Sequence, residues 1–244
     1  MRLLLVHGAW HAGWCWAPLV PHLEAAGHRV VAPDLPGHGP SVGGEDPARQ
    51  SMEGYIEAVV GWIEAESGPV VLVGHSLGGV VASAATERVT PGQVVGLVYV
   101  SGVLARSGQS MMAALLPRYE EPMGVPVFGG TALSLTRRNL THCFYHDCLD
   151  AVDQAVTQSV AQAVEPMEAP IELSAGRYGR VPRAYLFCDH DRVVTPDAQR
   201  RMVRRSPCQA FAHLPSGHMP MFSQPEAMGR ALGELLHRLS CGPA

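Results

Sequence analysis

Short apolar runs recur along the chain and are separated by polar residues, glycine and proline. Runs of this length that are rich in Val and Leu are typical of buried strands. They predict strands at residues 3–6, 29–32, 70–73, 94–101, 183–188 and 209–214.

Stretches with helical spacing of their apolar residues lie between several of these runs. Residues 14–26 form one such stretch, which Gly27 ends, and residues 52–65 form another. Strands that alternate with helices predict a mostly parallel sheet covered by helices on both faces.

Two later helices are predicted from their capping residues. Thr195 is a suitable N-cap for a helix that begins at Pro196 and runs through Arg205. Ser223 and Glu226 have the spacing of a capping box, which predicts a terminal helix to about residue 239.

The pattern changes between residues 104 and 180, where no clear strand is predicted and helical fragments such as residues 151–164 recur among Met, Pro and Gly. We expect a single domain whose α/β core comprises residues 1–104 and 181–244. Residues 105–180 are predicted to be an inserted helical cap. Because it follows a sheet strand, this cap can cover the carboxyl ends of the strands, where open α/β sheets bind ligands.

The segment Gly74-His75-Ser76-Leu77-Gly78 has the G-x-S-x-G form of a nucleophile elbow. An apolar strand precedes it and a helix-compatible run follows it, which is the context that the motif requires. A turn this tight holds the serine on strained backbone, so Gly74 and Gly78 need to lack a Cβ. The sequence therefore predicts Ser76 as an activated nucleophile.

A nucleophilic serine in this context needs an acid and then a base later in the chain. The loop after residues 183–188 offers Asp189 and Asp191. We favour Asp191, which lies inside the turn ahead of the capped helix. Asp189 is the alternative, as a turn residue that hydrogen-bonds its own backbone.

The base is predicted in the loop after the last strand. His218 follows a glycine in that loop, whereas His213 lies within the strand and is expected to face a neighbouring element. His75, beside the nucleophile, is interpreted as a packing residue, because adjacent residues on a tight turn point in different directions.

An oxyanion hole requires two converging backbone amides. One is predicted to be the amide of Leu77, after the nucleophile, and the other the amide of Ala9, in the loop after the first strand. Gly8 and Trp10, which flank Ala9, and Met219, which follows His218, are predicted to contact substrate.

These motifs together resemble the α/β-hydrolase superfamily, and more narrowly its plant methylesterase and hydroxynitrile lyase branch, which includes salicylate-binding methylesterases and bacterial relatives. The resemblance implies a mostly parallel eight-stranded sheet with a helical cap, and a triad that matches Ser76, Asp191 and His218. It rests on residues 7–11, Trp14, 23–28, 74–79, 144–148 and 217–219.

That branch contains ester hydrolysis and cyanohydrin cleavage on one scaffold. The lyases of the branch carry a Thr and a Lys that hold the substrate hydroxyl and the departing cyanide, and this chain has Gly8 and Met219 at those places. Without their hydroxyl and cation a departing cyanide lacks stabilisation. We therefore expect a cofactor-independent serine carboxylesterase without a metal, acting on small-molecule esters such as methyl esters of aromatic or secondary-metabolite acids.

Two alternative functions stay open. The same triad supports lactone or amide hydrolysis, C–C cleavage, or a lyase or cyclase step in polyketide or other secondary metabolism. A ligand-binding protein with a vestigial triad is the non-enzyme alternative. Residues 142–148 hold several His, Cys and Asp residues that suggest a zinc site, but their spacing fits packing within the cap better.

The composition limits the class of protein. With 47% hydrophobic and 16% charged residues and a net charge of -4, the chain is neither disordered nor suited to nucleic acid. No apolar stretch approaches the roughly 20 residues that span a membrane, and the first apolar run is too short for a signal peptide. Six scattered cysteines are expected to be reduced. We therefore expect a cytoplasmic protein, for which a homodimer is compatible with the sequence.

Overall fold

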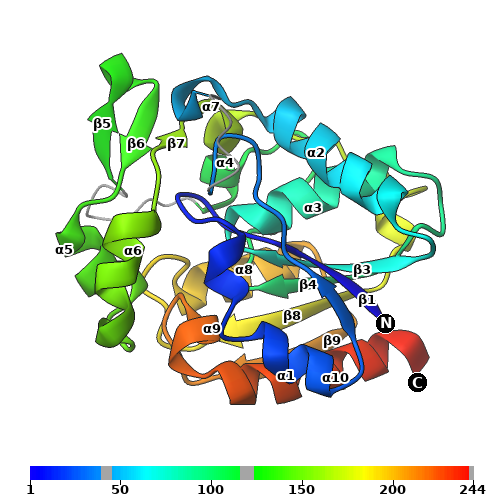
Figure 1. Cartoon of the computed structure of the whole chain (residues 1–244). Coiled ribbons are helices and arrows are strands. Elements are labelled where there is room, and N and C mark those ends of the chain that lie inside the picture. Colours follow the sequence, from blue (N-terminus) through cyan, green and yellow to red (C-terminus); the bar gives the residue numbers. More distant parts are fainter. Residues whose placement is uncertain (40–45, 116–123, 242–244) are drawn as a thin grey trace.

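A six-stranded parallel sheet forms the centre of the molecule in the computed structural model, which describes residues 1–39, 46–115 and 124–241 (Figure 1). The strand order is β2-β1-β3-β4-β8-β9, and the parallel sheet predicted from the alternation of strands and helices is confirmed. The strands are β1 (Arg2–Val6), β2 (Arg29–Val31), β3 (Val70–His75), β4 (Val94–Val100), β8 (Arg183–Cys188) and β9 (Ala210–Leu214).

Among the residues that the structure describes, the central sheet has the six strands predicted from the apolar runs, and not the eight that the resemblance implies. Each of the six predicted runs forms one strand of this sheet, to within two residues at its ends. The eight strands implied by the resemblance are not found in this sheet within the described residues. The other three strands of the described chain pair with one another, in a separate small sheet.

Helices cover both faces of the central sheet. α2 (Met52–Ala65) and α3 (Leu77–Arg88) lie on one face, and α1 (Val20–Ala25) and α10 (Pro225–Cys241) on the other (Figure 1). α8 (Pro196–Arg205) contacts β8, and α9 (Pro220–Ser223) precedes α10. Shorter 3₁₀ turns in the core are η1 (Gly13–Trp16) and η2 (Pro47–Arg49).

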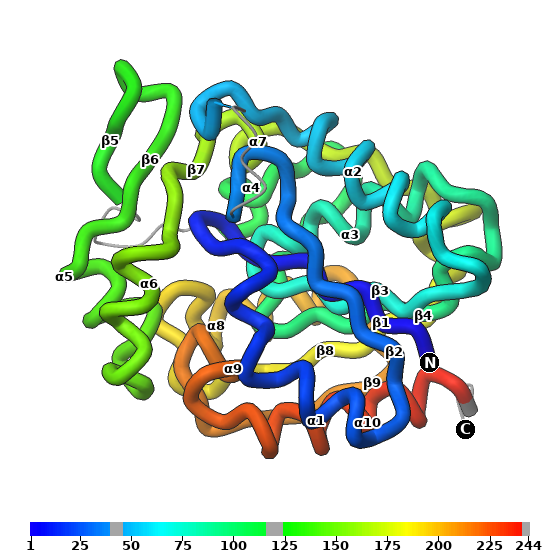
Figure 2. Tube along the Cα trace, viewed as in Figure 1, coloured from blue at the N-terminus to red at the C-terminus, as the bar shows by residue number. Residues whose placement is uncertain are grey.

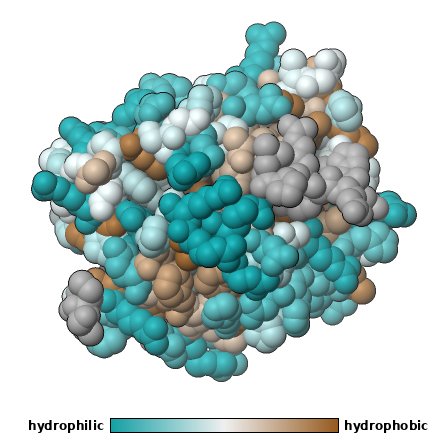
Figure 3. Space-filling view, turned by 180° about the vertical axis from the view of Figure 1, so that it is seen from behind, coloured by the Kyte–Doolittle hydropathy of each residue, from teal (hydrophilic) through white to brown (hydrophobic). Residues whose placement is uncertain are grey.

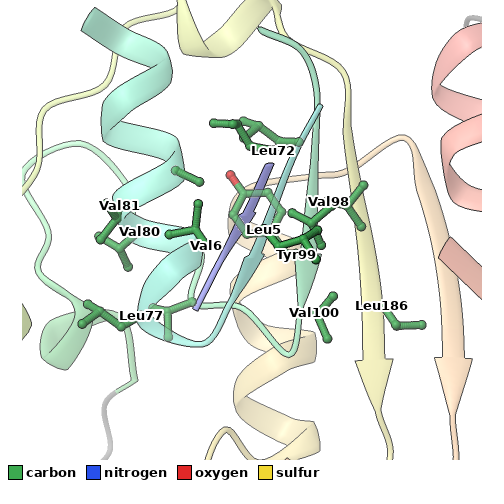
Figure 4. Close-up of a cluster of buried hydrophobic side chains, with 14 of the residues drawn as sticks. Leu5, Val6, Leu72, Leu77, Val80, Val81, Val98, Tyr99, Val100 and Leu186 are labelled. Atoms are coloured by element: carbon green, nitrogen blue, oxygen red, sulfur yellow. The ribbon is translucent and has the colours of Figure 1, made fainter. Parts of the chain in front are cut away.

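The core is packed from the apolar faces of these elements. Leu72 of β3, Val6 of β1 and Tyr99 of β4 lie on the face of the sheet covered by α3, which contributes Val80 and Val81 (Figure 4). All of these side chains are at most 2% exposed. Because apolar area removed from water stabilises the folded chain by roughly 25 cal/mol per Å², this layer helps to hold α3 on the sheet.

The segment between β4 and β8, residues 105–180, is called the insertion below. It contains a three-stranded antiparallel sheet of order β5-β6-β7, so the prediction that no strands occur here is wrong. The predicted helix over 151–164 is also too long, because it ends at Gln158 and the chain then pairs as β7. Its elements are α4 (Met111–Leu115), β5 (Val125–Val127), η3 (Phe128–Gly130), β6 (Ala132–Ser134), α5 (Arg137–Asn139), η4 (Leu140–Phe144), η5 (Leu149–Ala151), α6 (Val152–Gln158), β7 (Gln162–Ala163), α7 (Glu165–Glu168) and η6 (Tyr178–Arg180).

Two predicted helix boundaries also differ from the structure. The stretch 14–26 is divided into η1 and α1, because Pro21 has no amide hydrogen and occurs in the first turn of a new helix. The capping box is not formed, since α10 begins at Pro225 and the buried Ser223 hydroxyl has no hydrogen-bond partner. The predicted cap of α8 is confirmed, because Thr195 Oγ1 accepts from the amide of Ala198.

Within the insertion, β5, β6, α5 and α6 lie at the side of the molecule away from the N-terminus and from α10 in the view of Figure 2. Seen from behind, most of the visible surface is hydrophilic, with smaller hydrophobic areas between (Figure 3). None of the helices in the described residues is both long and apolar enough to cross a bilayer.

The sheet places five strand ends at one edge. In register, Val6 of β1 lies beside Gly74 of β3, His75 beside Val100 of β4, and Val100 beside Leu186 of β8. The loops after β1, β3, β4, β8 and β9 therefore leave the sheet on the same side, and they carry the residues described next.

Candidate active site

Ser76 lies in the tight turn between β3 and α3. Its backbone angles, φ 52° and ψ -122°, lie in a region that non-glycine residues rarely adopt. A Cβ on Gly78 would lie 2.2 Å from the carbonyl oxygen of Val6, and one on Gly74 would lie 2.7 Å from that of Gly78. The turn can pack this closely against β1 only with glycine at both positions, as the sequence predicts.

Asp191 lies in the loop after β8 and is 3% exposed. Its Oδ1 accepts hydrogen bonds from the amides of Val193 (2.6 Å) and Val194 (2.9 Å). Its Oδ2 accepts from the Ser101 hydroxyl and from Nδ1 of His218, 2.7 Å away. Four donors around one carboxylate hold it in a fixed orientation against the ring of His218.

His218 lies in the loop after β9 and is 1% exposed. Because the ionised Asp191 only accepts, Nδ1 of His218 carries the proton and Nε2 is left to accept another. The ring of Phe144 lies edge-on to the imidazole, with 5.3 Å between centroids. The predicted acid and base are therefore brought together in a buried, oriented pair.

His75 lies between the predicted nucleophile and the predicted base. Among the described residues no hydrogen bond joins Ser76 Oγ to His218, but Nε2 of His75 donates to the carbonyl oxygen of His218, 2.9 Å away. The two imidazole rings are 4.5 Å apart between centroids. His75 is therefore buried and packed, as its interpretation as a packing residue expects, and it also holds the backbone of His218.

The loop after β1 approaches the nucleophile closely. A Cβ on Gly8 would lie 2.9 Å from Cβ of Ser76, so only glycine allows this approach. Neither the amide of Ala9 nor that of Leu77 has a hydrogen-bond partner within the described chain. Two free amides beside the nucleophile have the donors that an oxyanion needs.

The side chain of His11 holds the loop after β1 in place. Its Nδ1 is 2.9 Å from the carbonyl oxygen of Ala9 and its Nε2 is 2.9 Å from the hydroxyl of Tyr145, in the insertion. Burial lowers the pKa of His11 to about 4. Burial, and then the neighbouring His218, likewise holds the pKa of His75 well below its usual value. Both rings therefore stay neutral at neutral pH.

The structure places the predicted substrate-contacting residues around these loops. Trp10 is 2% exposed, with a positive φ of 64°. Its indole nitrogen donates to the carbonyl oxygen of Leu133 (2.8 Å), and its own carbonyl oxygen accepts from the amide of Val160 (3.1 Å). Met219 is fully buried beside the base. Trp10 therefore joins the loop to the insertion, and its contact with substrate stays a prediction.

The alternative acid and base form a separate pair. Oδ1 of Asp189 is 3.0 Å from Nδ1 of His213, and both side chains are exposed to solvent. The ring of His213 stacks on Phe187, with 4.6 Å between centroids. The carboxylate of Asp189 therefore bonds to another side chain, and not to its own backbone as the turn interpretation predicted.

Ser101 is a site residue that the sequence analysis missed. It follows β4 directly, is completely buried, and has a positive φ of 41°. The sequence could have indicated Ser101, because it follows a strand that ends at the same edge as β3. Its contact with Asp191, however, joins residues that are 90 positions apart in the sequence. Within the part of the chain that the structure describes, no group of three or more His, Cys, Asp and Glu side chains is placed to hold a metal ion.

Comparisons with known proteins show the family of this chain. The alpha/beta hydrolase family model matches residues 3–231. The pyrethroid hydrolase of Sphingobium wenxiniae is 32% identical over 245 residues, which cover 95% of this chain and 86% of that protein. Methylesterase 7 of Arabidopsis thaliana is 27% identical over 257 residues, which cover 96% of this chain and 95% of the relative.

A solved structure is similar throughout its length. The crystal structure of a pyrethroid hydrolase from Sphingobium faniae aligns with a TM-score of 0.85 and 30% identity, and the alignment covers 99% of each chain. The predicted resemblance to plant methylesterases and their bacterial relatives is therefore confirmed, as is the predicted fold class.

Proposed function

This chain belongs to the α/β-hydrolase family, and from that premise we propose that it is a serine carboxylesterase that acts through Ser76, His218 and Asp191. The single observation that carries the proposal is the buried pair of Asp191 and His218, 2.7 Å apart, at the sheet edge where the Ser76 turn also lies. A vestigial site would have no need of an oriented, fully buried acid–base pair.

The first half of the reaction forms an acyl-enzyme. Nε2 of His218 takes the proton of Ser76 as its oxygen attacks the ester carbonyl carbon. Catalytic hydrogen bonds are often long without substrate and shorten when it binds, so the open Ser76–His218 contact fits this step. Asp191 keeps the ring in the required tautomer and stabilises the imidazolium that forms.

Negative charge develops on the former carbonyl oxygen during this attack. The amides of Ala9 and Leu77, which have no other partner in the described chain, donate to this oxygen. His218 then returns its proton to the alcohol oxygen, and the C–O bond breaks. Water, activated by the same base, releases the acid and restores Ser76.

The substrates proposed are small esters, in particular methyl esters of aromatic or secondary-metabolite acids. Support comes from the names of the relatives, which include a pyrethroid hydrolase and a plant methylesterase. Gly8, Trp10 and Met219 are the proposed substrate contacts. Every step uses groups of this chain, so the mechanism requires no cofactor.

Two further expectations belong to the same proposal. The insertion acts as a cap over the site, supported by its hydrogen bonds to the loop of Trp10. A cytoplasmic location is supported by the cysteines, since Cys15, Cys148, Cys188 and Cys208 are not in disulfides.

The test is turnover of a panel that contains p-nitrophenyl acetate, methyl esters of aromatic acids, lactones and amides, with wild type, Ser76→Ala and His218→Gln in parallel. We expect methyl esters to be hydrolysed and both variants to lose at least about a thousandfold in kcat. If only lactones or only amides were turned over, that class would replace esters as the proposed substrates. Tight binding of an aromatic ester by folded wild type without turnover would support the ligand-binding alternative.

A further inference from the structure

Residues 142–148 of the insertion lie against the two loops that carry the proposed acid and base. Nε2 of His146 donates to the carbonyl oxygen of His190, 3.0 Å away, and His190 directly precedes Asp191. Oδ2 of Asp147 accepts from the amide of Gly217, 2.5 Å away, and Gly217 directly precedes His218. Two adjacent side chains thus hold the two residues that come just before the acid and the base.

The side chains of His146 and Asp147 lie close to the Cα of Gly217. A Cβ there would lie 2.6 Å from Oδ1 of Asp147 and 2.8 Å from Nε2 of His146. Asp147 is exposed at the surface, but the backbone it holds is buried. A side chain at position 217 would therefore have to displace the ends of both side chains from their present contacts.

The acid and base loops are also joined directly to each other. The amide of His190 donates to the carbonyl oxygen of Ser216, 3.0 Å away. A displacement of either loop therefore moves the other. Nη1 of Arg192, just after the acid, donates to the carbonyl oxygen of His142, which adds a third link from the insertion.

We propose that His146 and Asp147 form a clasp, with Asp147 as a positioning residue that sets the place of His218 by holding the amide of Gly217. The proposal rests on the proposed esterase function and deepens it. The clasp touches no reacting atom. It acts because a catalytic group displaced by about 1 Å can lose on the order of a hundredfold in rate, and a charge-assisted hydrogen bond prevents such a displacement.

The substitutions that test the clasp are Asp147→Ala, which removes the acceptor, and Asp147→Asn, whose amide oxygen still accepts from the Gly217 amide. Asp150→Ala is the matched control, since Asp150 is an exposed carboxylate of the insertion three residues away. For Asp147→Ala we expect kcat for p-nitrophenyl acetate to fall about tenfold with KM unchanged, because positioning acts on the transition state. Asp147→Asn should restore most of the loss, and Asp150→Ala should match wild type.

A double-variant cycle separates positioning from a general loss of stability. Gly217→Ala alone should lower kcat because its methyl group meets the Asp147 carboxylate. In the double variant Asp147→Ala, Gly217→Ala the contact with the carboxylate is removed and only that with His146 remains, so we expect kcat at or above that of Gly217→Ala rather than the product of the two losses. The far-downfield proton resonance of His218 Nδ1–H, which reports its bond to Asp191, should broaden or shift in Asp147→Ala and be unchanged in Asp150→Ala.

The outcomes distinguish the two proposals. Wild-type kcat and an unchanged proton resonance in Asp147→Ala would overturn the clasp and leave the esterase function standing. Equal losses in Asp147→Ala and Asp147→Asn would also overturn it, because the asparagine keeps the acceptor. Absence of any ester turnover in wild type would overturn the esterase function and the clasp with it.

Discussion

His75 donates a hydrogen bond from Nε2 to the carbonyl oxygen of His218, 2.9 Å away, and both residues are buried. The residue before the proposed nucleophile therefore holds the backbone of the proposed base. His75→Phe removes this donor and leaves a buried carbonyl unpaired, which costs about 1–3 kcal/mol. We expect kcat and the free energy of unfolding both to fall, as measured by ester turnover and denaturant unfolding.

His75→Gln is the informative companion of that variant. The glutamine amide can donate to the same carbonyl, so we expect it to recover more activity than phenylalanine. His237→Phe, at an exposed position of α10, serves as the control and should behave as wild type. If phenylalanine and glutamine at position 75 were equally active, His75 would have no role through His218.

Gly8 is predicted to be irreplaceable for activity. A Cβ there would lie 2.9 Å from Cβ of Ser76 and 3.0 Å from Nδ1 of His75, and both neighbours are buried. Gly8→Ala must therefore displace the nucleophile or the oxyanion loop, and we expect kcat/KM to fall by about a hundredfold or more. Gly233→Ala, in open space on α10, is the matched change and should leave kcat/KM as it is. Equal activity of the two variants would contradict the close approach.

Ser101 gives a prediction about the orientation of the proposed acid. Its hydroxyl bonds to the same Asp191 oxygen that receives Nδ1 of His218. Without this donor the carboxylate is held by three hydrogen bonds in place of four, so His218 is oriented less precisely. We expect kcat for ester turnover to fall about tenfold in Ser101→Ala.

The positive φ of Ser101, 41°, allows a second variant that separates this effect from folding. Glycine adopts this conformation without strain, so Ser101→Gly should be at least as stable as Ser101→Ala while it lacks the same hydroxyl. We expect the same loss of kcat in both. Wild-type kcat in either folded variant would show that Ser101 does not act on His218.

The buried histidines predict how stability depends on pH. Burial lowers the pKa of His11 from 6.5 to about 4. The unfolded chain therefore takes up a proton below pH 6.5 that the folded chain refuses until about pH 4. The contribution of His11 to the free energy of unfolding is therefore fully present above pH 6.5 and is lost as the pH falls toward 4. This loss amounts to about 3 kcal/mol.

Denaturant unfolding between pH 7 and pH 4 checks this sign. His11→Phe should lower the unfolding free energy at pH 7, because the bonds to Ala9 and Tyr145 are lost, but its dependence on pH should be weaker than that of wild type. A pH dependence as steep as that of wild type would mean that His11 is not the group that resists protonation.

The central sheet could be predicted because its signals are local. Each strand is an apolar run, and the Ser76 turn, Asp191 and His218 each follow such a run. Parallel strands place these loops at one edge without any knowledge of packing. The proposed acid and base, Asp191 and His218, differ from Asp189 and His213 in their place in the loop, which the sequence alone contains.

The insertion could not be predicted in the same way. β5 contains Pro126 within Val125–Val127, and β7 has only two residues, so neither has a strand pattern of its own. Both exist because they pair with β6. The contacts of Ser101 and Asp147 also join residues 90 and 70 positions apart, which no local pattern contains.

The measurement that tests the central claim most directly is the intact mass of the protein after exposure to a fluorophosphonate, for wild type and Ser76→Ala in parallel. An activated serine attacks this reagent, and the buried side chains around it do not. We predict a single adduct on wild type, located at Ser76 by peptide mapping, and none on Ser76→Ala. Equal labelling of the two proteins, or no labelling of a folded wild type, would contradict the account.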